Sequence, residues 1–318
     1  MKIGLLEPLN IPQEMVVSFG MRLEEAGHSF VSYQTKTTDP EELVARSEGL
    51  DVVMIANNPY PDAVIRRLPD LKMIAVAFTG IDHVGLAAAK ERGILVCNCA
   101  GYSDACVAEQ VLGMTISLLR HFTEGNAAVR AGGTSAGLIG TEIRDKTVGI
   151  IGFGHIGGQV ARLFQAFGAR VVTASRSRRE EMAALGIPYV TLPELLKMSD
   201  IISLHVPNNA ETRGLIGEKE IALMKETAIF INCARGPIVD NAALAKALNE
   251  GHLAGAGIDV FDMEPPLPAD YPLLGAKNTL LMPHVAFLTK EAMLRRAEIE
   301  FANVENYLVG KPQNVCVF

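Results

Sequence analysis

Short apolar runs alternate with longer amphipathic runs through most of this chain, and this alternation limits the folds that it can adopt. Strands alternating with helices predict parallel sheets covered on both faces. In the first third of the chain the expected strands are 2–6, 30–33, 51–56, 71–77 and 94–97, and the expected helices are 13–26, 41–47 and 62–68. A second series has expected strands at 147–151, 170–174, 201–205, 228–232, 256–259 and 279–282, and expected helices at 156–167 and 291–308. The sequence therefore predicts an α/β protein with two doubly wound parallel sheets.

The segment between the two series is different in character. It reads as one long helical stretch from Cys106 to about Arg130, followed by a glycine-rich break at 131–137. A length of 318 residues also fits two domains, since a typical domain has roughly 150 residues.

Charge and composition exclude several classes of protein. The 29 basic and 36 acidic residues give a net charge of −7, which argues against nucleic-acid or anionic-membrane partners. No apolar run reaches the roughly 18 residues of a membrane helix, and the start of the chain turns acidic too early for a signal peptide. Five cysteines are a sparse, odd count, which fits a reducing cytoplasm better than a disulfide scaffold.

A glycine loop follows the first strand of the second series. Strand 147–151 runs into Gly152-Phe153-Gly154-His155-Ile156-Gly157, which is G-x-G-x-x-G between a strand and a helix. The first glycine makes a tight turn, the second lets the backbone approach a pyrophosphate, and the third lets helix and strand pack closely. The N-terminus of the helix then offers free N–H groups to the phosphates. We therefore expect Gly152, Gly154, His155, Ile156 and Gly157 to bind a dinucleotide.

The end of the next strand bears on which dinucleotide is bound. An NAD site usually has an acidic residue about 20 residues after the glycine loop, to bind the ribose 2′-hydroxyl. This chain has Ser175 at that place, followed by Arg176, Arg178 and Arg179. Guanidinium groups would hold a 2′-phosphate by charge-assisted hydrogen bonds, so NADP(H) is favoured and NAD(H) stays possible. The alternative is an ordinary solvated charged turn, since glutamates follow at once.

Several motifs together make the chain resemble the D-isomer-specific 2-hydroxyacid dehydrogenases over essentially its whole length. The segments that carry the resemblance are 152–157, 232–236, 259–265, 283–284, 102–109 and 205–207 with Thr212. The resemblance implies a Rossmann cofactor domain, 100–285, inserted in a flavodoxin-like substrate domain, 1–99 plus 286–318. It also implies a substrate cleft between the domains and a homodimer built by the long helix and the Gly132 loop.

The same resemblance places a catalytic set on Arg235, Glu264 and His284. The residue types suit the chemistry. A guanidinium can grip a carboxylate and approach the adjacent ketone oxygen. Histidine can give a proton in reduction and take one in oxidation, and a neighbouring carboxylate favours its imidazolium form.

Further contacts are expected around this set. The resemblance implies cofactor contacts, some near the nicotinamide and others near the adenosine, from Ser103, Cys106, His205, Val206, Pro207, Thr212 and Asp259, and we expect Cys233 and Ala234 beside them. For the substrate it implies the turn of Thr79, Gly80 and Ile81, whose N–H groups would face the carboxylate, together with Arg235 and His284. Asn57 follows an expected strand end, where ligands of open α/β sheets bind, so it is a further candidate. Cys97 and Cys99 lack a second cysteine pair, so no metal site is expected.

The expected activity is NAD(P)H-dependent reduction of a small 2-oxo acid, such as glyoxylate, hydroxypyruvate or a pyruvate-like acid, to the D-2-hydroxy acid. Two features of the sequence indicate different substrates. The order after His284 is similar to the D-lactate and D-2-hydroxyisocaproate branch, whereas the arginine-rich turn is similar to glyoxylate and hydroxypyruvate reductases. The alternatives are a dinucleotide-sensing corepressor-like binding protein on the same fold, and a phosphoglycerate dehydrogenase without its regulatory domain.

Overall fold

The structure is a computed structural model that describes residues 1–176 and 180–318. It consists of two compact units, Met1–Ser103 with Leu288–Phe318 and Asp104–Phe287. The expected boundaries differ slightly from these, because Ser103 directly precedes a helix and the N–H of Ala286 is bonded to Asp259 of the second unit. Arg178 lies outside the described residues.

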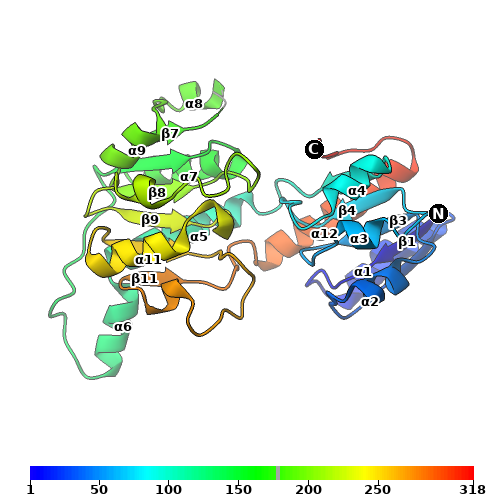
Figure 1. Cartoon of the computed structure of the whole chain (residues 1–318), viewed down its shortest axis with the longest axis horizontal. Coiled ribbons are helices and arrows are strands. Elements are labelled where there is room, and N and C mark those ends of the chain that lie inside the picture. The colour runs from blue at the N-terminus through cyan, green and yellow to red at the C-terminus, as the bar shows by residue number, and fades with distance from the viewer. Residues whose placement is uncertain (177–179) are drawn as a thin grey trace. The chain divides into compact units, whose positions relative to one another are not determined.

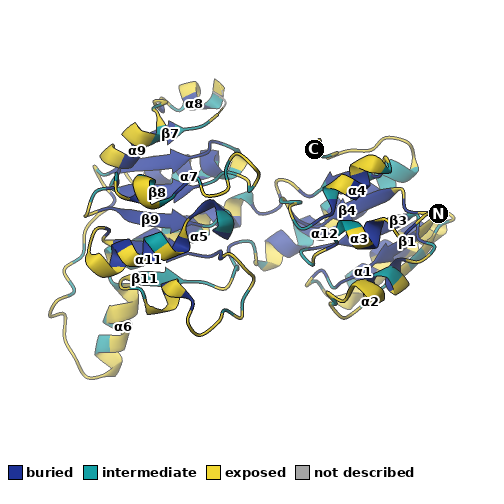
Figure 2. Cartoon of the chain, viewed as in Figure 1, coloured by how far each residue is buried: buried dark blue, intermediate teal, exposed yellow. Residues whose placement is uncertain are grey.

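The first unit contains a five-stranded parallel sheet in the order β2-β1-β3-β4-β5, which is the flavodoxin-like order (Figure 1). Its strands are β1 (Lys2–Leu5), β2 (Ser29–Ser32), β3 (Val52–Ile55), β4 (Met73–Val76) and β5 (Leu95–Asn98). Its helices are α1 (Gln13–Glu25), α2 (Pro40–Ser47), α3 (Asp62–Ile65), α4 (Leu86–Glu91) and α12 (Lys290–Leu308). Every residue of β3 and β4 is buried, because helices cover both faces of a parallel sheet (Figure 2).

The second unit contains a six-stranded parallel sheet in the order β11-β10-β9-β8-β6-β7. Its strands are β6 (Thr147–Ile151), β7 (Arg170–Ala174), β8 (Ile201–Leu204), β9 (Ile229–Asn232), β10 (Gly255–Ile258) and β11 (Thr279–Leu281). Its helices are α5 (Asp104–Leu119), α6 (Phe122–Arg130), α7 (His155–Ala166), α8 (Glu180–Ala184), α9 (Leu192–Met198), α10 (Glu218–Ile221) and α11 (Asn241–Glu250), with single 3₁₀ turns at Gly236–Ile238 and Pro272–Gly275. Beyond β7, Tyr189 forms an isolated parallel bridge with Thr173. This bridge stands where the Rossmann order has a third strand beside its second. The predicted class, two doubly wound parallel-sheet α/β domains, is confirmed.

The prediction of a single helix from Cys106 to about Arg130 is wrong. The structure has two helices in this segment, because the backbone of His121 adopts the left-handed conformation, with a φ of +53°. Histidine is among the residues that adopt this left-handed conformation more readily than most. α5 buries apolar residues against the sheet, whereas none of the nine described residues of α6 is buried. The break therefore separates a core helix from one that leaves the core (Figure 2).

None of the helices in the described part of the chain combines the length and the apolarity that crossing a membrane would need.

Candidate active site

The three residues expected to be catalytic follow three neighbouring strands of the second unit. Arg235 lies three residues after β9, Glu264 lies in the loop after β10, and His284 comes shortly after β11. Strands β9, β10 and β11 pair in parallel, so their carboxyl ends share one edge of the sheet. Open α/β sheets bind their ligands at this edge.

His284 and Glu264 are in direct contact. The Nδ1 atom of His284 lies 2.8 Å from Oε1 of Glu264, and the two form an ion pair when the imidazole is protonated. The imidazole is 12% exposed, while the glutamate is 63% exposed. One ring nitrogen is therefore oriented by a carboxylate, and the other, Nε2, is the candidate atom for proton exchange with a substrate.

The backbone around His284 is held in an uncommon conformation. Its φ is +54°, and its N–H donates to the carbonyl of Asp259 at 2.8 Å. The carboxylate of Asp259 accepts the next two N–H groups, of Val285 and Ala286, at 2.9 and 3.0 Å. Burial raises the pKa of Asp259, although these two hydrogen bonds and His284 oppose the shift. Asp259 thus anchors the segment that presents the imidazole.

A separate network holds the loop that carries Glu264. The hydroxyl of Tyr271 donates to Oδ2 of Asp262 at 2.9 Å, and the amide of Asn241 donates to Oδ1 at 3.0 Å. Tyr271 is 7% exposed, and burial raises its pKa to about 12, so it remains a donor. None of the three residues was expected to have a role at the site: Asp262 lies within the expected motif at 259–265, whereas Asn241 and Tyr271 lie outside it.

Arg235 is fixed by the turn in which it lies. The side chain of Asn232 donates to the carbonyl of Arg235 and accepts the N–H of Ala234. At Gly236 an added Cβ would lie 1.9 Å from the carbonyl of Phe261. Only glycine lets this turn approach the backbone at Phe261, which leads to Glu264. The loops that carry Arg235 and Glu264 are therefore in direct backbone contact.

The glycine loop has the geometry of a phosphate cradle. Gly152 has a φ of +92°, a region that favours glycine, and an added Cβ at Gly157 would lie 2.3 Å from the carbonyl of Gly152. At Gly154 nothing lies within 4 Å of an added Cβ, so the space beside this residue is open. α7 begins at His155, and no described side chain caps its N-terminus. The N–H groups of the first turn of a helix, here including that of Ile156, have no partner within the helix and can bind an anion. The residues present fit the pyrophosphate of a dinucleotide.

The loop after β8 lies beside the glycine loop. The N–H of His205 donates to the carbonyl of Ile151, and an added Cβ at Gly152 would lie 2.5 Å from the carbonyl of His205. Burial lowers the pKa of His205 to about 4, so its ring is neutral at neutral pH. The ring forms a hydrogen bond with the hydroxyl of Ser203. Val206 and Pro207 continue the loop, and Thr212 closes it by donating to the carbonyl of Pro207.

The expected 2′-phosphate site is described only in part. Ser175 is half-buried at the end of β7, and Arg176 is exposed. The guanidinium of Arg176 forms an ion pair with Glu211 at 2.9 Å, with the two side chains 82% and 69% exposed.

The remaining residues expected to contact the cofactor lie at the start of α5 and in the turn after β9. Ser103 and Cys106 are buried at the start of α5, and Ala234 is half-buried. The Sγ atom of Cys233 lies 3.8 Å from the Sδ atom of Met114, and burial raises its pKa well above the usual value. This thiol stays protonated, so Cys233 is not a nucleophile.

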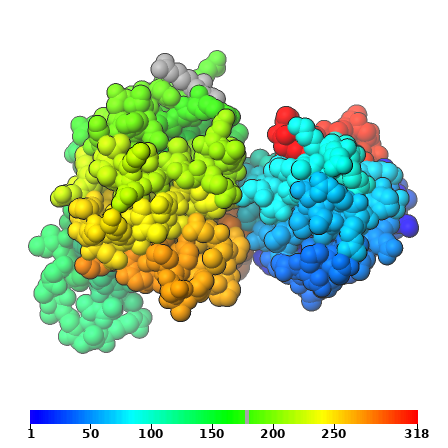
Figure 3. All heavy atoms as spheres, in the orientation of Figure 1, coloured from blue at the N-terminus to red at the C-terminus, as the bar shows by residue number. Residues whose placement is uncertain are grey.

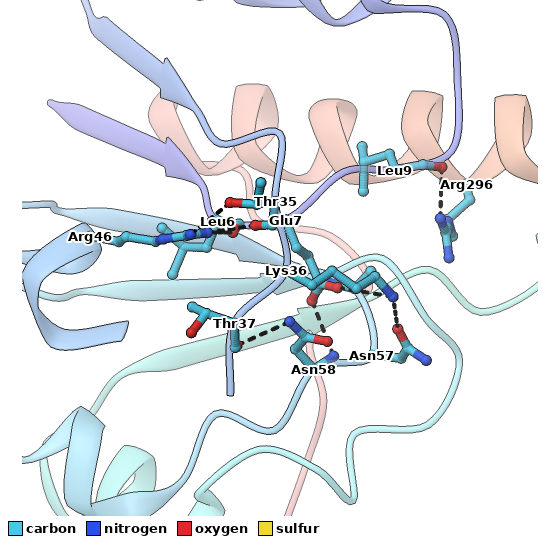
Figure 4. A network of polar contacts seen from close by, with 11 residues as sticks. Leu6, Glu7, Leu9, Thr35, Lys36, Thr37, Arg46, Asn57, Asn58 and Arg296 are labelled. Atoms are coloured by element: carbon cyan, nitrogen blue, oxygen red, sulfur yellow. Dashed lines mark hydrogen bonds and ion pairs between the residues drawn. The ribbon is translucent and has the colours of Figure 1, made fainter. Parts of the chain in front are cut away.

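The expected substrate residues of the first unit lie along the carboxyl edge of its sheet. Asn57 follows β3, and Thr79, Gly80 and Ile81 follow β4, where the side chain of Asn98 donates to the carbonyl of Thr79 at 2.8 Å. Sequence reasoning missed Glu7 and Lys36, which contact the same edge after β1 and β2 (Figure 4). Their position after strand ends was the available signal.

Comparisons with known proteins agree with this geometry. Residues 112–286 match the family model described as D-isomer specific 2-hydroxyacid dehydrogenase, NAD binding domain. A hydroxypyruvate reductase from Blautia hydrogenotrophica is 35% identical over 302 residues, covering 92% of this chain and 93% of the relative.

Two solved structures are similar over nearly the whole chain. One is the acyclic imino acid reductase Bsp5 in complex with NADPH and D-Arg, with a TM-score of 0.90, 31% identity and complete coverage of both chains. The other is a D-lactate dehydrogenase from Aquifex aeolicus complexed with NAD and lactic acid, with a TM-score of 0.85 and 29% identity, covering 97% of this chain and 96% of that one.

Proposed function

This chain belongs to the family of D-isomer specific 2-hydroxyacid dehydrogenases, and on that premise we propose that it reduces small 2-oxo acids of the glyoxylate, hydroxypyruvate and pyruvate type to D-2-hydroxy acids. It is an oxidoreductase that uses NAD(P)H. The observation that carries the proposal is the contact between His284 and Glu264 at the edge where Arg235 also lies.

Each catalytic residue has a distinct role in this proposal. The nicotinamide of the bound coenzyme supplies the hydride that reaches C2 of the substrate. Arg235 binds the substrate carboxylate and polarises the ketone oxygen. His284 donates the proton from Nε2 to that oxygen as it becomes a hydroxyl, and Glu264 stabilises the protonated ring through Nδ1.

Membership of the family also supports the expected contacts between this chain and its coenzyme. We propose that Gly152, Gly154, His155, Ile156 and Gly157 bind the pyrophosphate, supported by the open space at Gly154. The segments at 205–207 and 233–234, with Thr212, Asp259, Ser103 and Cys106, would complete the dinucleotide site. In the first unit, Asn57 and the turn at 79–81 would contact the substrate.

NADP(H) is the coenzyme that we propose as preferred. Ser175 and Arg176 stand at the end of β7 in place of a carboxylate, and Arg178 would add a second guanidinium. Comparing kcat/KM for NADPH and NADH in the wild type and in Arg176→Ala tests this. Loss of NADPH preference in the variant is expected, whereas a preference for NADH that Arg176→Ala leaves unchanged contradicts it.

We also propose that the protein forms a homodimer through α6 and the loop that follows it. Large apolar side chains of this segment are exposed, with Phe122 at 58%, Val129 at 74% and Ile139 at 91%. A neighbouring surface pocket of about 230 Å³ is lined by residues that include Ile116, Leu119 and Phe167.

A cytoplasmic location is proposed from the sparse, odd number of cysteines, and cell fractionation tests it.

The activity is tested with a panel of glyoxylate, hydroxypyruvate, pyruvate and phenylpyruvate and with both coenzymes. Oxidation of NADPH or NADH with at least one of the first three acids is expected. If none of the four is reduced, the proposed function is wrong.

A further inference from the structure

Polar side chains from three strand ends meet in the first unit at the point where its strand order reverses. That point lies between β1 and β3, and ligands of open α/β sheets bind beyond the carboxyl ends of the strands there. Glu7 follows β1, Lys36 follows β2, and Asn57 follows β3 (Figure 4).

The three side chains are linked through Lys36. Its Nζ atom donates to Oδ1 of Asn57 at 3.0 Å and lies 3.7 Å from Oε2 of Glu7. Glu7 is only 1% exposed, and its Oε1 accepts the N–H groups of Ala56 and Asn58 at 2.7 and 3.1 Å. Its Oε2 has no hydrogen-bond partner among the described residues. A fixed, buried carboxylate therefore holds the ammonium group in place.

The loops that carry these side chains are also tied together. Arg46 is 8% exposed, and its Nη1 atom donates to the carbonyls of Leu6 and Thr35 at 3.0 and 2.6 Å. Leu6 and Thr35 directly precede Glu7 and Lys36, so one buried guanidinium sets the distance between them. The side chain of Asn58 joins the third loop by donating to the carbonyl of Thr37 at 3.1 Å. This arrangement is preorganised, which lowers the entropic cost of binding a ligand.

Lys36 retains capacity for a ligand. Its side chain is 47% exposed, and an ammonium has three donors, of which Asn57 accepts one. We propose that Lys36 and Asn57 bind an oxygen on the third carbon of the substrate, and that the enzyme selects 3-hydroxy-2-oxo acids. This inference rests on the proposed function.

The spacing of the sheet fits a three-carbon substrate. The turn at 79–81, proposed to bind the substrate carboxylate, follows β4, and β4 pairs with β3. Neighbouring strands lie about 4.8 Å apart. An acid whose carboxylate is bound at the end of β4 can therefore reach the end of β3, where Asn57 and Lys36 lie, with its third carbon.

The charge of the cluster favours a neutral hydroxyl over a second anion. Glu7 balances the charge of Lys36, so the pair offers a hydrogen-bond donor without a net positive charge. A distal carboxylate or phosphate would be repelled by Glu7 at close range. Hydroxypyruvate is thus preferred over pyruvate, which lacks the hydroxyl, and over oxaloacetate, which carries a second carboxylate.

The experiment compares kcat/KM for hydroxypyruvate, pyruvate and oxaloacetate in the wild type, in Lys36→Met and in Asn57→Ala. We expect the ratio of hydroxypyruvate to pyruvate to fall at least about tenfold in Lys36→Met, as loss of a hydrogen bond from a charged donor implies. A smaller fall in the same ratio is expected in Asn57→Ala. Lys72→Met is the matched control, since Lys72 also pairs with a carboxylate, Asp51, but precedes β4 at the opposite edge of the sheet.

Three results would overturn the inference. The first is a ratio that stays unchanged in both Lys36→Met and Asn57→Ala. The second is a fall of equal size in Lys72→Met, and the third is a wild type that prefers oxaloacetate and loses that preference in Lys36→Met. A wild type that reduces pyruvate but shows any of these results leaves the proposed function standing, whereas one that reduces none of the acids overturns both.

Discussion

At the scale of single residues, the chemistry depends on how His284 is held. Its left-handed backbone conformation costs free energy for a residue with a side chain, and such strain is often found at functional sites. Asp259 offsets the cost by accepting the two following N–H groups, and Glu264 orients the ring. The position of Nε2 is therefore determined by two carboxylates from the loop after β10.

Replacing the imidazole should remove proton transfer and little else. In His284→Ala we expect kcat to fall by roughly 10²- to 10⁴-fold, the usual contribution of a general acid. The dissociation constant for NADPH should change little, because the glycine loop is untouched. Steady-state kinetics and coenzyme titration measure the two, and an unchanged kcat would remove His284 from the mechanism.

Glu300 is a buried acid that the mechanism does not use. It is fully buried in α12, and both of its carboxyl oxygens lack a hydrogen-bond partner among the described residues. Burial raises the pKa of Glu300 well above its usual value, which Arg296 opposes and Glu7 reinforces. The folded state thus retains a proton that the unfolded state releases.

The pH dependence of stability follows from this shift. A carboxyl group with a raised pKa stabilises the fold fully below its unfolded pKa, and the stabilisation is lost as the pH rises toward the folded value. We expect the free energy of unfolding to fall with rising pH, by at most about 1.4 kcal/mol per pH unit for one proton. Glu300→Gln should flatten this slope in urea unfolding, whereas Glu298→Gln, exposed on the same helix, should not. Equal slopes in all three proteins would contradict the assignment.

At the scale of elements, the loop between β10 and β11 joins the catalytic residues to the core. Asp262 lies two residues before Glu264 and is bonded to Tyr271 and Asn241. Tyr271 also packs edge-on against Phe261, with ring centroids 5.7 Å apart. This network orients Glu264 through the backbone rather than by contact with a ligand.

Removing the hydroxyl of Tyr271 should loosen Glu264. In Tyr271→Phe we expect kcat to fall about two- to twelvefold, since one buried hydrogen bond contributes about 0.5–1.5 kcal/mol. KM should change little, because Arg235 and the turn at 79–81 are unaffected. Steady-state kinetics test this, with Tyr307→Phe in the first unit as control, and a fall in kcat of the same size in Tyr307→Phe would contradict the positioning role.

Some helices and strands could be predicted from the sequence and others could not, for physical reasons. Strands such as 147–151 and 170–174 were predicted to the residue, because buried parallel strands consist mostly of apolar residues. The break at His121 was missed, since α5 and α6 are both compatible with helix and only packing distinguishes them. The short helix α4 and the 10-residue helix α11 were also missed.

The candidate site was predictable in part. Arg235, Glu264 and His284 came from a family resemblance, and their shared sheet edge then follows from the strand order. Glu7 and Lys36 follow strand ends, as Asn57 does, but glutamate and lysine are common on surfaces, so this position alone did not distinguish them. Their role depends on contacts between loops that lie 29 positions apart in the sequence.

At the scale of the whole molecule, one unit is inserted in the sequence of the other, so α12 returns to the first sheet after the second is complete. α6 and its following loop project from the rest of the second unit (Figures 1 and 3). A helix without buried residues has little to stabilise it in isolation. In the proposed homodimer, a second copy of the chain would cover this helix.

The homodimer is tested by making this segment polar. The wild type should sediment as a dimer, and Ile139→Asp should weaken the dimer at least about tenfold, because an exposed isoleucine becomes a charge at the interface. Val317→Asp, at a fully exposed position outside the segment, is the control. A monomeric wild type in analytical ultracentrifugation would contradict the proposal.

The central claim is that this chain reduces 2-oxo acids to D-2-hydroxy acids. The most direct test is to reduce hydroxypyruvate with NADPH and the purified protein, and to analyse the glycerate formed by chiral chromatography. The account predicts D-glycerate in amounts equal to the NADPH consumed. Formation of L-glycerate, or consumption of NADPH without glycerate, would contradict it.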